Sequence, residues 1–233
     1  SISGGTDIIG CFLAGSPILP VHRGELQCAQ LGMDVQSWDT NGKPVFGQSG
    51  ELVCTRPFPS MPIGFWNDED GSKYQEAYFD DFERVWTHGD YIKMTANGGA
   101  IIYGRSDTTL NPGGVRIGTA EIYRAVENME QIVDVVVVGR PNEGDVDVVL
   151  CVKLTKGTDF DEKLESDIRG LIRSATTPRH VPKYIFEVDD IPYTISGKKV
   201  EKAVLATITG RKVDNKDVLA NPESLKQYSA LSF

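Results

Sequence analysis

Cysteine and histidine are scarce in this sequence, and neither follows a spacing that holds a metal. The four cysteines (Cys11, Cys28, Cys54 and Cys151) are far apart with no CxxC pair, and there are only three histidines. Structural zinc sites need four closely spaced ligands, and disulfide scaffolds need a higher density of cysteine. The sequence therefore argues against both and predicts a protein of a reducing compartment, by default the cytosol.

Long apolar runs and positive charge are also in short supply. The longest apolar stretches, such as residues 135–139, are far shorter than the roughly 20 residues that a membrane-spanning helix needs. Acidic residues outnumber basic ones by 33 to 24, and the net charge of −9 disfavours a nucleic-acid partner. We expect a soluble chain without a membrane span, and the sequence does not predict its oligomeric state.

Residues 1–105 consist of short β-type runs separated by glycine, proline, asparagine and aspartate. Asn41-Gly42 predicts a two-residue hairpin turn because this pair tolerates positive φ, and residues 57–81 are expected to form a surface excursion. Many short strands at close spacing are typical of a small barrel or a curled sheet. Strands are predicted at 35–38, 50–55 and 100–103.

Helical and β-branched patterns begin after Arg105. In the segment 119–129, Ile122, Val126 and Met129 lie on one face of a predicted helix. The order of the elements indicates a compact α+β unit of about 100 residues. The tail from Asp214 onward has no clear period and is expected to lie along the surface. Further helices are predicted at 159–174 and 200–208, and strands at 132–139, 146–154 and 184–188.

Two short motifs in the first part combine glycine with a carboxylate. In Gly4-Gly5-Thr6-Asp7, the glycines admit an anion to the backbone, Thr6 can bind a phosphate oxygen, and Asp7 can hold Mg²⁺. In Trp86-Thr-His-Gly-Asp90, the carboxylate can accept hydrogen bonds from the two hydroxyls of a ribose. Taken alone, each motif more often marks an ordinary turn.

A richer segment lies where the composition changes from strand-rich to helical. It contains Arg105 and Arg116, the Gly113-Gly114 turn and the opening of a helix. A linker with solvated arginines explains this spacing equally well. Glu121 is expected to be a first-turn residue favoured by the helix dipole, and not a catalyst.

Near the end of the chain, Ser196-Gly197-Lys198 presents a lysine from a turn just before the last predicted helix. A point cation on a flexible stem suits a moving contact with a phosphate or a carboxylate. A solvated surface lysine is the ordinary alternative, so this motif indicates a function only in combination with the other motifs of the chain.

Taken in order, these motifs resemble those of the adenylate-forming acyl-CoA synthetases. Thr6-Asp7 is similar to the Thr-Glu of their ATP-site loop, and His88-Gly89-Asp90 is similar to their ribose motif. Six matches in order cover nearly the whole chain. The other four are Gly-Glu-Leu at 50–52, the Gly-Arg-x-Asp hinge at 104–107, its Gly-Val-Arg-Ile extension at 114–117 and the Ser-Gly-Lys motif at 196–198.

In the detailed sequence of these motifs, the chain most resembles the subfamily that activates acetoacetate. Like that subfamily, the sequence has Asp7 in place of the usual Glu, His88 in place of Thr or Ser, and Tyr193 in place of Lys. The resemblance implies acetoacetate, ATP and CoA as small-molecule substrates, with Mg²⁺. A synthetase for acetate or propionate and a non-catalytic nucleotide-binding remnant stay open as alternatives.

The resemblance also implies that the chain is a C-terminal fragment of an α/β enzyme with the adenylate-forming fold. Residues 1–106 would be the end of the large N-terminal AMP-binding domain with a small β-barrel subdomain, and residues 107–233 a compact α+β lid domain with a terminal tail. The family's phosphate-loop lysine has no counterpart here. Most of the acyl pocket is expected before Ser1, and the fragment alone is expected to be inactive.

Each candidate site residue takes its role from this resemblance. Lys198 is implied as the catalytic cation, with Asp90 and Arg105 holding the ribose. Thr6 and Asp7 belong to the ATP site, where Asp7 is the implied Mg²⁺ ligand. The remaining implied roles are a hinge at Asp107, a CoA tunnel lined by Gly114, an adenylate contact from Arg116 and a contact of Arg169 with CoA phosphates.

Overall fold

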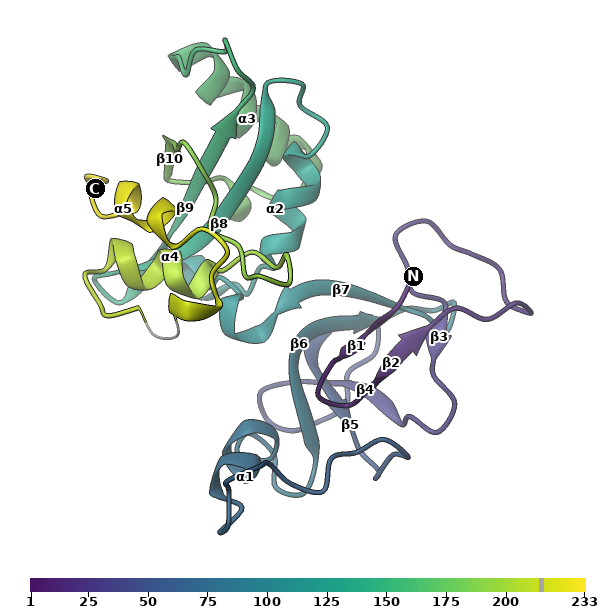
Figure 1. The fold of residues 1–233 in the computed structure, drawn as a ribbon. Helices are drawn as coiled ribbons and strands as arrows, with labels where there is room; N and C mark the ends of the chain where they lie inside the picture. Colours follow the sequence, from purple (N-terminus) through teal and green to yellow (C-terminus); the bar gives the residue numbers. More distant parts are fainter. Residues whose placement is uncertain (214–215) are drawn as a thin grey trace. The chain divides into compact units, whose positions relative to one another are not determined.

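The computed structural model describes residues 1–213 and 216–233 (Figure 1). The chain divides into two compact units, Ser1–Asp107 and Thr108–Phe233. The first two residues of the tail predicted from Asp214 onward therefore lie outside the described residues. Among the described residues, no helix has the length and apolar character that crossing a membrane requires.

The first unit contains two sheets that share one core. The three-stranded sheet has the order β1-β2-β3, and the four-stranded antiparallel sheet has the order β4-β5-β6-β7. Phe12 from the first sheet, Leu52 and Trp86 from the second, and Phe58 between them belong to a single buried cluster. The strands are β1 (Ser3–Gly5), β2 (Gly10–Ala14), β3 (Cys28–Ala29), β4 (Val35–Trp38), β5 (Ser49–Cys54), β6 (Trp86–Met94) and β7 (Ala100–Arg105).

The sequence predicted three of the seven strands of this unit and did not predict β1, β2, β3 or β6. The three predicted strands are confirmed as β4, β5 and β7, whereas the small barrel is not confirmed, since the described strands form two separate sheets. The predicted surface excursion contains a short helix, α1 (Ser72–Tyr78), which has no fully buried residue and no side-chain cap. Tyr74 and Tyr78 pack against the core of this unit, but two aromatic residues in a seven-residue helix are too few to show a period in the sequence.

The turn predicted at Asn41-Gly42 is present, but it is not a two-residue hairpin loop. Only Gly42 has positive φ, at 70°, and the Asp39 carboxylate accepts hydrogen bonds from the amides of Asn41 and Lys43, both at 2.9 Å. The chain then continues to Ser49 before β5 begins. The aspartate at the start of the turn therefore shapes it as much as the glycine does.

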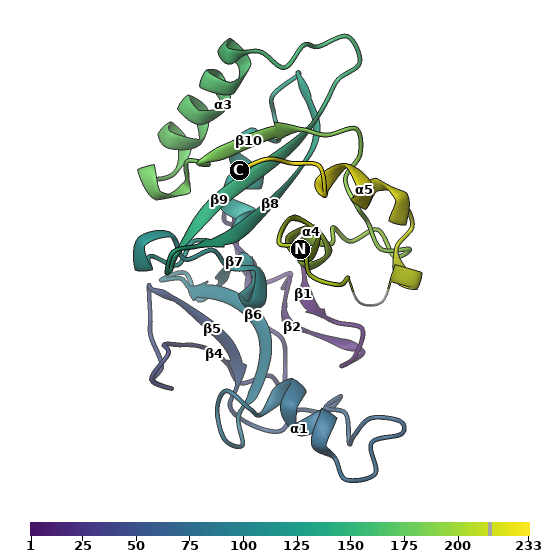
Figure 2. The same ribbon diagram turned by 90° about the vertical axis from the view of Figure 1, so that its left-hand side faces the viewer.

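The second unit is a three-stranded sheet in the order β10-β9-β8 with helices on both faces (Figures 1 and 2). Strands β8 and β9 pair antiparallel, and β10 pairs parallel to β9. All the predicted helices and strands of this part are confirmed within a few residues. They are α2 (Thr119–Val126), β8 (Ile132–Asn142), β9 (Asp145–Leu154), α3 (Glu162–Ala175), β10 (Tyr184–Glu187) and α4 (Glu201–Ile208).

Alternating valines on β8 serve two different cores. Val135 and Val137 pack with α2 and α3 on one face of the sheet, while Val136 and Val138 pack with α4 and the end of the chain on the other. Successive side chains of a strand point to opposite faces, so a strand that is covered on both faces must be apolar throughout. This explains the unbroken β-branched run in the sequence.

The prediction that the tail lies along the surface is wrong for its described part. The tail forms a short helix, α5 (Leu225–Tyr228), in which Tyr228 is fully buried and Leu225 is 6% exposed. The Tyr228 hydroxyl donates to the Asp190 carbonyl at 2.9 Å. A helix of one turn is too short to show a period, which is why the sequence did not indicate this packing.

Candidate functional site

Asp90 and Arg105 face each other across strands β6 and β7. The two residues are direct partners in the strand register, and Arg105 Nη1 lies 3.4 Å from Asp90 Oδ1 and donates to the His88 carbonyl at 2.9 Å. The Asp90 side chain is 14% exposed. Burial raises the pKa of Asp90, although the charges of His88 and Arg105 act in the opposite direction. The carboxylate is thus held in place with part of its edge open.

The His88-Gly89-Asp90 motif lies inside β6 and not in a hairpin turn, so the alternative of an ordinary turn is excluded. Gly89 has a φ of +78°, and a Cβ there would lie 2.6 Å from Arg105 Nη2. Only glycine adopts this conformation without strain and also leaves room for the guanidinium. The irregularity in the pairing of β6 with β7 follows directly, between Tyr91 and Ile92.

His88 is 8% exposed and lies edge-on to Phe12, with 4.7 Å between the ring centroids. Burial lowers the pKa of His88, an effect that outweighs the nearby carboxylates of Asp90 and Asp7. Among the described residues, its Nδ1 atom is buried without a hydrogen-bond partner. Burial therefore favours the neutral form of the imidazole beside the Asp90 carboxylate.

Asp7 lies in the turn between β1 and β2, and its Oδ2 accepts a hydrogen bond from the Tyr78 hydroxyl at 2.6 Å. A Cβ on Gly5 would lie 1.9 Å from Asp7 Oδ1 and 2.9 Å from His88 Cε1, so this glycine allows the carboxylate to fold back toward the histidine. Thr6 is exposed in the same turn. The structure thus brings Asp7, His88, Asp90 and Arg105 together in the first unit.

Tyr78 is a residue of this site that sequence reasoning missed. Its ring stacks on Trp86 with 3.7 Å between centroids, and burial followed by the hydrogen bond to Asp7 raises the pKa of its phenol. On β5, which pairs with β6, the Glu51 carboxylate accepts a hydrogen bond from the Ser106 hydroxyl at 2.7 Å. Tyr78 belongs to α1, inside the stretch expected to be a surface excursion, and no spacing in the sequence indicates its contact with Asp7.

The described residues contain no group of three or more histidine, cysteine, aspartate or glutamate side chains that could hold a metal ion. Asp7 is exposed and offers one carboxylate, of which one oxygen already accepts from Tyr78. Mg²⁺ commonly binds one or two carboxylates and completes its shell with water and substrate phosphates. Asp7 fits this kind of shared site and would not fit a metal site built of protein ligands alone.

In the second unit, Gly114 lies at the tip of a short loop whose ends, Leu110 and Ile117, pair as an isolated bridge. The loop is anchored by Gly113, whose amide donates to Asp145 Oδ1 at 2.6 Å. A Cβ on Gly114, which has a φ of +78°, would meet no atom within 4 Å. The tip is therefore open to solvent within this unit, and the exposed Arg116 follows it.

Glu121 lies in the first turn of α2, as the sequence predicts. Its carboxylate accepts from the amide of Gly118 at 3.1 Å and lies 3.2 Å from His180 Nε2. These two hydrogen bonds lower the pKa of Glu121, although burial acts in the opposite direction. The helix start is thereby tied to the segment that follows α3.

Lys198 lies at the end of a tight turn in the second unit. The amide of Thr194 donates to the Lys198 carbonyl at 2.8 Å, and the Lys198 amide donates to Thr194 Oγ1 at 3.0 Å. Gly197 supplies the positive φ of 79° that such a turn requires. The Lys198 side chain is exposed, so the turn presents its ammonium to solvent.

Arg169 is engaged within its own unit. Its guanidinium donates to Glu165 Oε1 at 2.6 Å and to the carbonyls of Pro182 and Lys183. These contacts join α3 to the start of β10. A contact of Arg169 with CoA phosphates stays a prediction, and it would have to be made alongside these hydrogen bonds.

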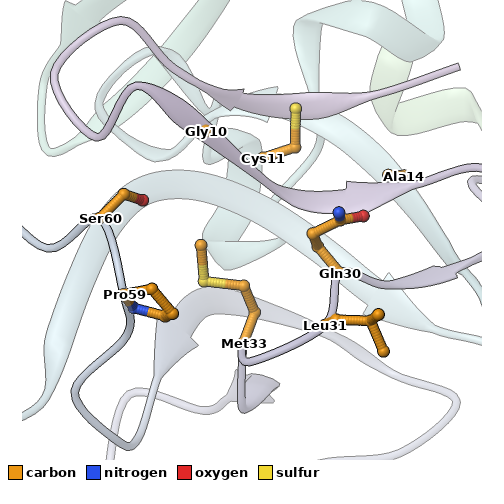
Figure 3. Close-up of a pocket in the computed structure, with 8 residues that line it drawn as sticks. All are labelled: Gly10, Cys11, Ala14, Gln30, Leu31, Met33, Pro59 and Ser60. Carbon is orange, nitrogen blue, oxygen red and sulfur yellow. The ribbon is translucent and has the colours of Figure 1, made fainter.

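One cavity of the first unit lies apart from the predicted site residues. It has a volume of about 320 Å³, and Figure 3 shows the Met33 side chain directed between β2 and the Pro59–Ser60 segment. Its lining is mostly apolar and contains none of Asp7, Asp90 or Arg105. The residues that line it are Gly10, Cys11, Ala14, Gln30, Leu31, Met33, Pro59 and Ser60.

The amino-acid sequence of this chain is similar to those of known proteins. Residues 121–198 match the family model of the AMP-binding enzyme C-terminal domain. An acetoacetyl-coenzyme A synthetase of Rhizobium meliloti is 56% identical over 99% of this chain, and one of Danio rerio is 52% identical over 99%. The chain is homologous to acetoacetyl-CoA synthetases. It spans about a third of these relatives, 36% and 35% of their lengths.

Solved structures agree with this homology. The acetoacetyl-CoA synthetase from Streptomyces lividans has a TM-score of 0.92 and 44% identity, covering 98% of this chain and 35% of that one. An anthranilate CoA ligase with a TM-score of 0.71 and 21% identity covers 84% of this chain and 37% of its own, and shows the shared fold. The predicted resemblance and the α+β adenylate-forming fold are confirmed. The residue roles and the functional limits of the parts 1–106 and 107–233 stay predictions.

Proposed function

We propose that this chain belongs to an enzyme that activates acetoacetate with ATP and transfers the acyl group to CoA. The observation that carries the proposal is the 49–56% identity to relatives named acetoacetyl-CoA synthetase, over nearly the whole chain. The cluster of Asp7, Asp90 and Arg105 supports it, because a partly open carboxylate beside a fixed guanidinium suits a nucleotide.

The reaction has two half-reactions. A carboxylate oxygen of acetoacetate attacks the α-phosphate of ATP, the bond to the leaving pyrophosphate breaks, and acetoacetyl-adenylate forms. The thiol of CoA then attacks the acyl carbon, loses its proton, and AMP leaves with the bonding electron pair. The first step brings two anions together, so a cation near the reacting oxygens should stabilise its transition state most.

Lys198 is the residue that we assign to this role. Its ammonium is exposed on a turn held by Thr194, and it would contact the carboxylate and phosphate oxygens. Asp90 would accept hydrogen bonds from the ribose hydroxyls, and Arg105 would hold Asp90 in position. Thr6 would contact phosphate. Asp7 would hold Mg²⁺, which when bound neutralises charge on the phosphates.

Residues of the second unit would serve the thioester step. Gly114, open at the tip of its loop, would line the passage for CoA, with Arg116 beside the adenylate and Arg169 toward the CoA phosphates. Asp107 ends the first unit and would act as the hinge between the two half-reactions. Proline fixes φ, so Asp107→Pro should change the ratio of the two half-reaction rates. Unchanged rates of both would remove Asp107 from this role.

The deciding experiment separates the half-reactions in the full-length protein. Lys198→Ala should reduce acetoacetate-dependent exchange of pyrophosphate into ATP by about 10²- to 10³-fold, the usual loss for one preorganised charge contact. Formation of acetoacetyl-CoA from supplied acetoacetyl-adenylate should change little. Equal loss of both steps would contradict the assignment of Lys198.

The same assay tests the substrate. Wild-type exchange should be faster with acetoacetate than with acetate or propionate. Faster exchange with either of the other acids would favour a different short-chain synthetase, and no exchange with any acid would favour a non-catalytic nucleotide-binding protein.

A further inference from the structure

The turn that carries Lys198 is held at its base by one carboxylate. We propose that Asp134, on β8, is a positioning residue that fixes the ammonium of Lys198 for the first half-reaction. This proposal rests on the proposed function of Lys198. It concerns contacts within Thr108–Phe233 only.

The two arms of the turn meet at a pair of residues directly before and after it. Tyr193 and Lys199 form an isolated antiparallel bridge that flanks the segment 194–198. Because they are cross-strand partners, any force that holds both side chains also fixes the orientation of the turn between them.

Asp134 binds both members of this pair. The Tyr193 hydroxyl donates to Asp134 Oδ2 at 2.7 Å, and Lys199 Nζ lies 2.6 Å from Asp134 Oδ1. The side chains of Asp134 and Lys199 are 18% and 25% exposed. Each oxygen of one carboxylate thus holds one arm, which is a two-point attachment to the sheet.

Lys199 is further committed to the body of the unit. Its ammonium donates to the Val135 carbonyl at 2.7 Å and lies 4.6 Å from the centre of the Tyr123 ring. Tyr123 in turn donates to Glu201 Oε1 at 2.5 Å. The two adjacent lysines therefore have different environments, since Lys198 is exposed and Lys199 is anchored.

This arrangement gives a small exposed turn a defined direction. Lysine has a flexible stem. One arm of the turn also pairs with the tail, since the Ile195 amide donates to the Val218 carbonyl at 2.9 Å, whereas Asp134 ties both arms to β8 and limits pivoting of the turn about its base. A displacement of about 1 Å at a reacting group can cost about a hundredfold in rate. Holding both arms by Asp134 limits the pivot while leaving the Lys198 side chain itself untouched.

The test uses the full-length protein and Asp134→Asn, which keeps the shape but removes the charge that binds Lys199. We expect the kcat of acetoacetate-dependent pyrophosphate exchange to fall by about 10- to 100-fold with an unchanged KM for ATP. Thioester formation from supplied acetoacetyl-adenylate should change by less than about threefold. Tyr193→Phe should move the same rate in the same direction by a smaller factor.

Asp147→Asn is the matched control. Asp147 lies on the neighbouring strand β9, is 10% exposed and binds Lys183 at 2.9 Å and Arg140 at 3.4 Å, so it is a comparable ion-paired carboxylate that does not touch the turn. This variant should leave the ratio of the two half-reaction rates unchanged. A similar change in that ratio would mean that Asp134 acts only through the general stability of the unit.

The double variant Asp134→Asn with Lys198→Ala decides between positioning and other roles. If Asp134 acts through Lys198, adding Asp134→Asn to Lys198→Ala should cause no further loss of residual exchange. Full additivity, equal loss in both half-reactions, or no loss with Asp134→Asn would each overturn the proposal. If Asp134→Asn does not fold, Tyr193→Phe and its double variant decide by the same criteria. A normal exchange rate in Lys198→Ala alone would instead show that the proposed function of Lys198 has failed.

Discussion

The two units hold their candidate functional side chains in opposite ways. In Ser1–Asp107, Asp90 is largely buried within a strand, and its cross-strand partner Arg105 and the buried His88 surround it. In Thr108–Phe233, Lys198 and Gly114 lie on exposed turns that are anchored through neighbouring residues. One unit fixes the side chain, and the other fixes the support beneath it.

The difference fits the two tasks that we propose. A group that recognises a nucleotide gains from being fixed before the ligand arrives, because no ordering remains to be done on binding. A cation that serves one half-reaction and then withdraws must be exposed and must be carried by a rigid support. The comparison predicts that substitutions at Asp90 act locally, whereas the support of Lys198 extends to β8.

The largest expected effect tests whether each core stabilises its own unit. Trp86→Ala removes a fully buried ring that packs with Phe58 and Tyr78, and should lower the unfolding free energy of the first unit by about 3–5 kcal/mol. All three tryptophans lie in residues 1–107, so the fluorescence of Trp38 and Trp66 reports on this unit. Unchanged fluorescence transitions would contradict the prediction.

Ile168→Ala is the matching change in the second unit. Ile168 is fully buried in the core between α3 and the sheet, and its truncation should cost about 2–5 kcal/mol. Amide hydrogen exchange of β8 and β9 should report the loss. If each variant reduces protection only in its own unit, the two cores are energetically separate; equal loss in both units would end the comparison.

The sequence predicted the second unit better because its signals are long. Strands β8 and β9 have 11 and 10 residues and contain β-branched runs, and the apolar residues of α3 recur at helical spacing over 14 residues. Apart from the nine-residue strand β6, which was not predicted, the errors concern short segments. Neither α1, which has no buried residue, nor α5, which has one turn, contains enough residues to show a period.

The candidate site was predicted by residue identity but not by geometry. Order and spacing singled out Asp90 and Arg105, yet their contact depends on the register of β6 with β7, which the sequence does not specify. Tyr78 and Asp134 were missed for the same reason. Each acts through a partner roughly 60 or more positions away, Asp7 in one case and Tyr193 in the other.

Two glycines with the same backbone conformation sharpen the comparison at an intermediate energy. Gly89 and Gly197 have φ of +78° and +79°, but a Cβ would meet Arg105 Nη2 at 2.6 Å in the first and nothing within 4 Å in the second. Gly89→Ala should cost about 3 kcal/mol, from backbone strain and displaced hydrogen bonds of Arg105. It should also weaken binding of ATP.

Gly197→Ala should cost only the backbone strain of about 1–2 kcal/mol. Tryptophan fluorescence measures the first variant, and amide exchange of the second unit measures the other. Equal costs would show that Arg105 yields easily and that the site around Asp90 is not fixed as we describe.

The smallest expected effect is the pH dependence that buried His88 gives to the first unit. Burial lowers the pKa of His88 in the folded state, whereas in the unfolded state it titrates near its ordinary value of 6.5. Just below pH 6.5 the unfolded state therefore binds more protons, so the unfolding free energy of this unit should fall as the pH is lowered, by at most about 1.4 kcal/mol per pH unit. Above that range the contribution is constant.

Tryptophan-monitored denaturation between pH 5 and 8 should show this slope in the wild type and a flatter one in His88→Gln. As a control, His180→Gln changes a buried histidine of the second unit and should leave the slope unchanged. If His88→Gln instead showed the same slope as the wild type, the pH dependence would belong to other groups. The imidazole of His88 would then not be the neutral neighbour of Asp90 that its burial indicates.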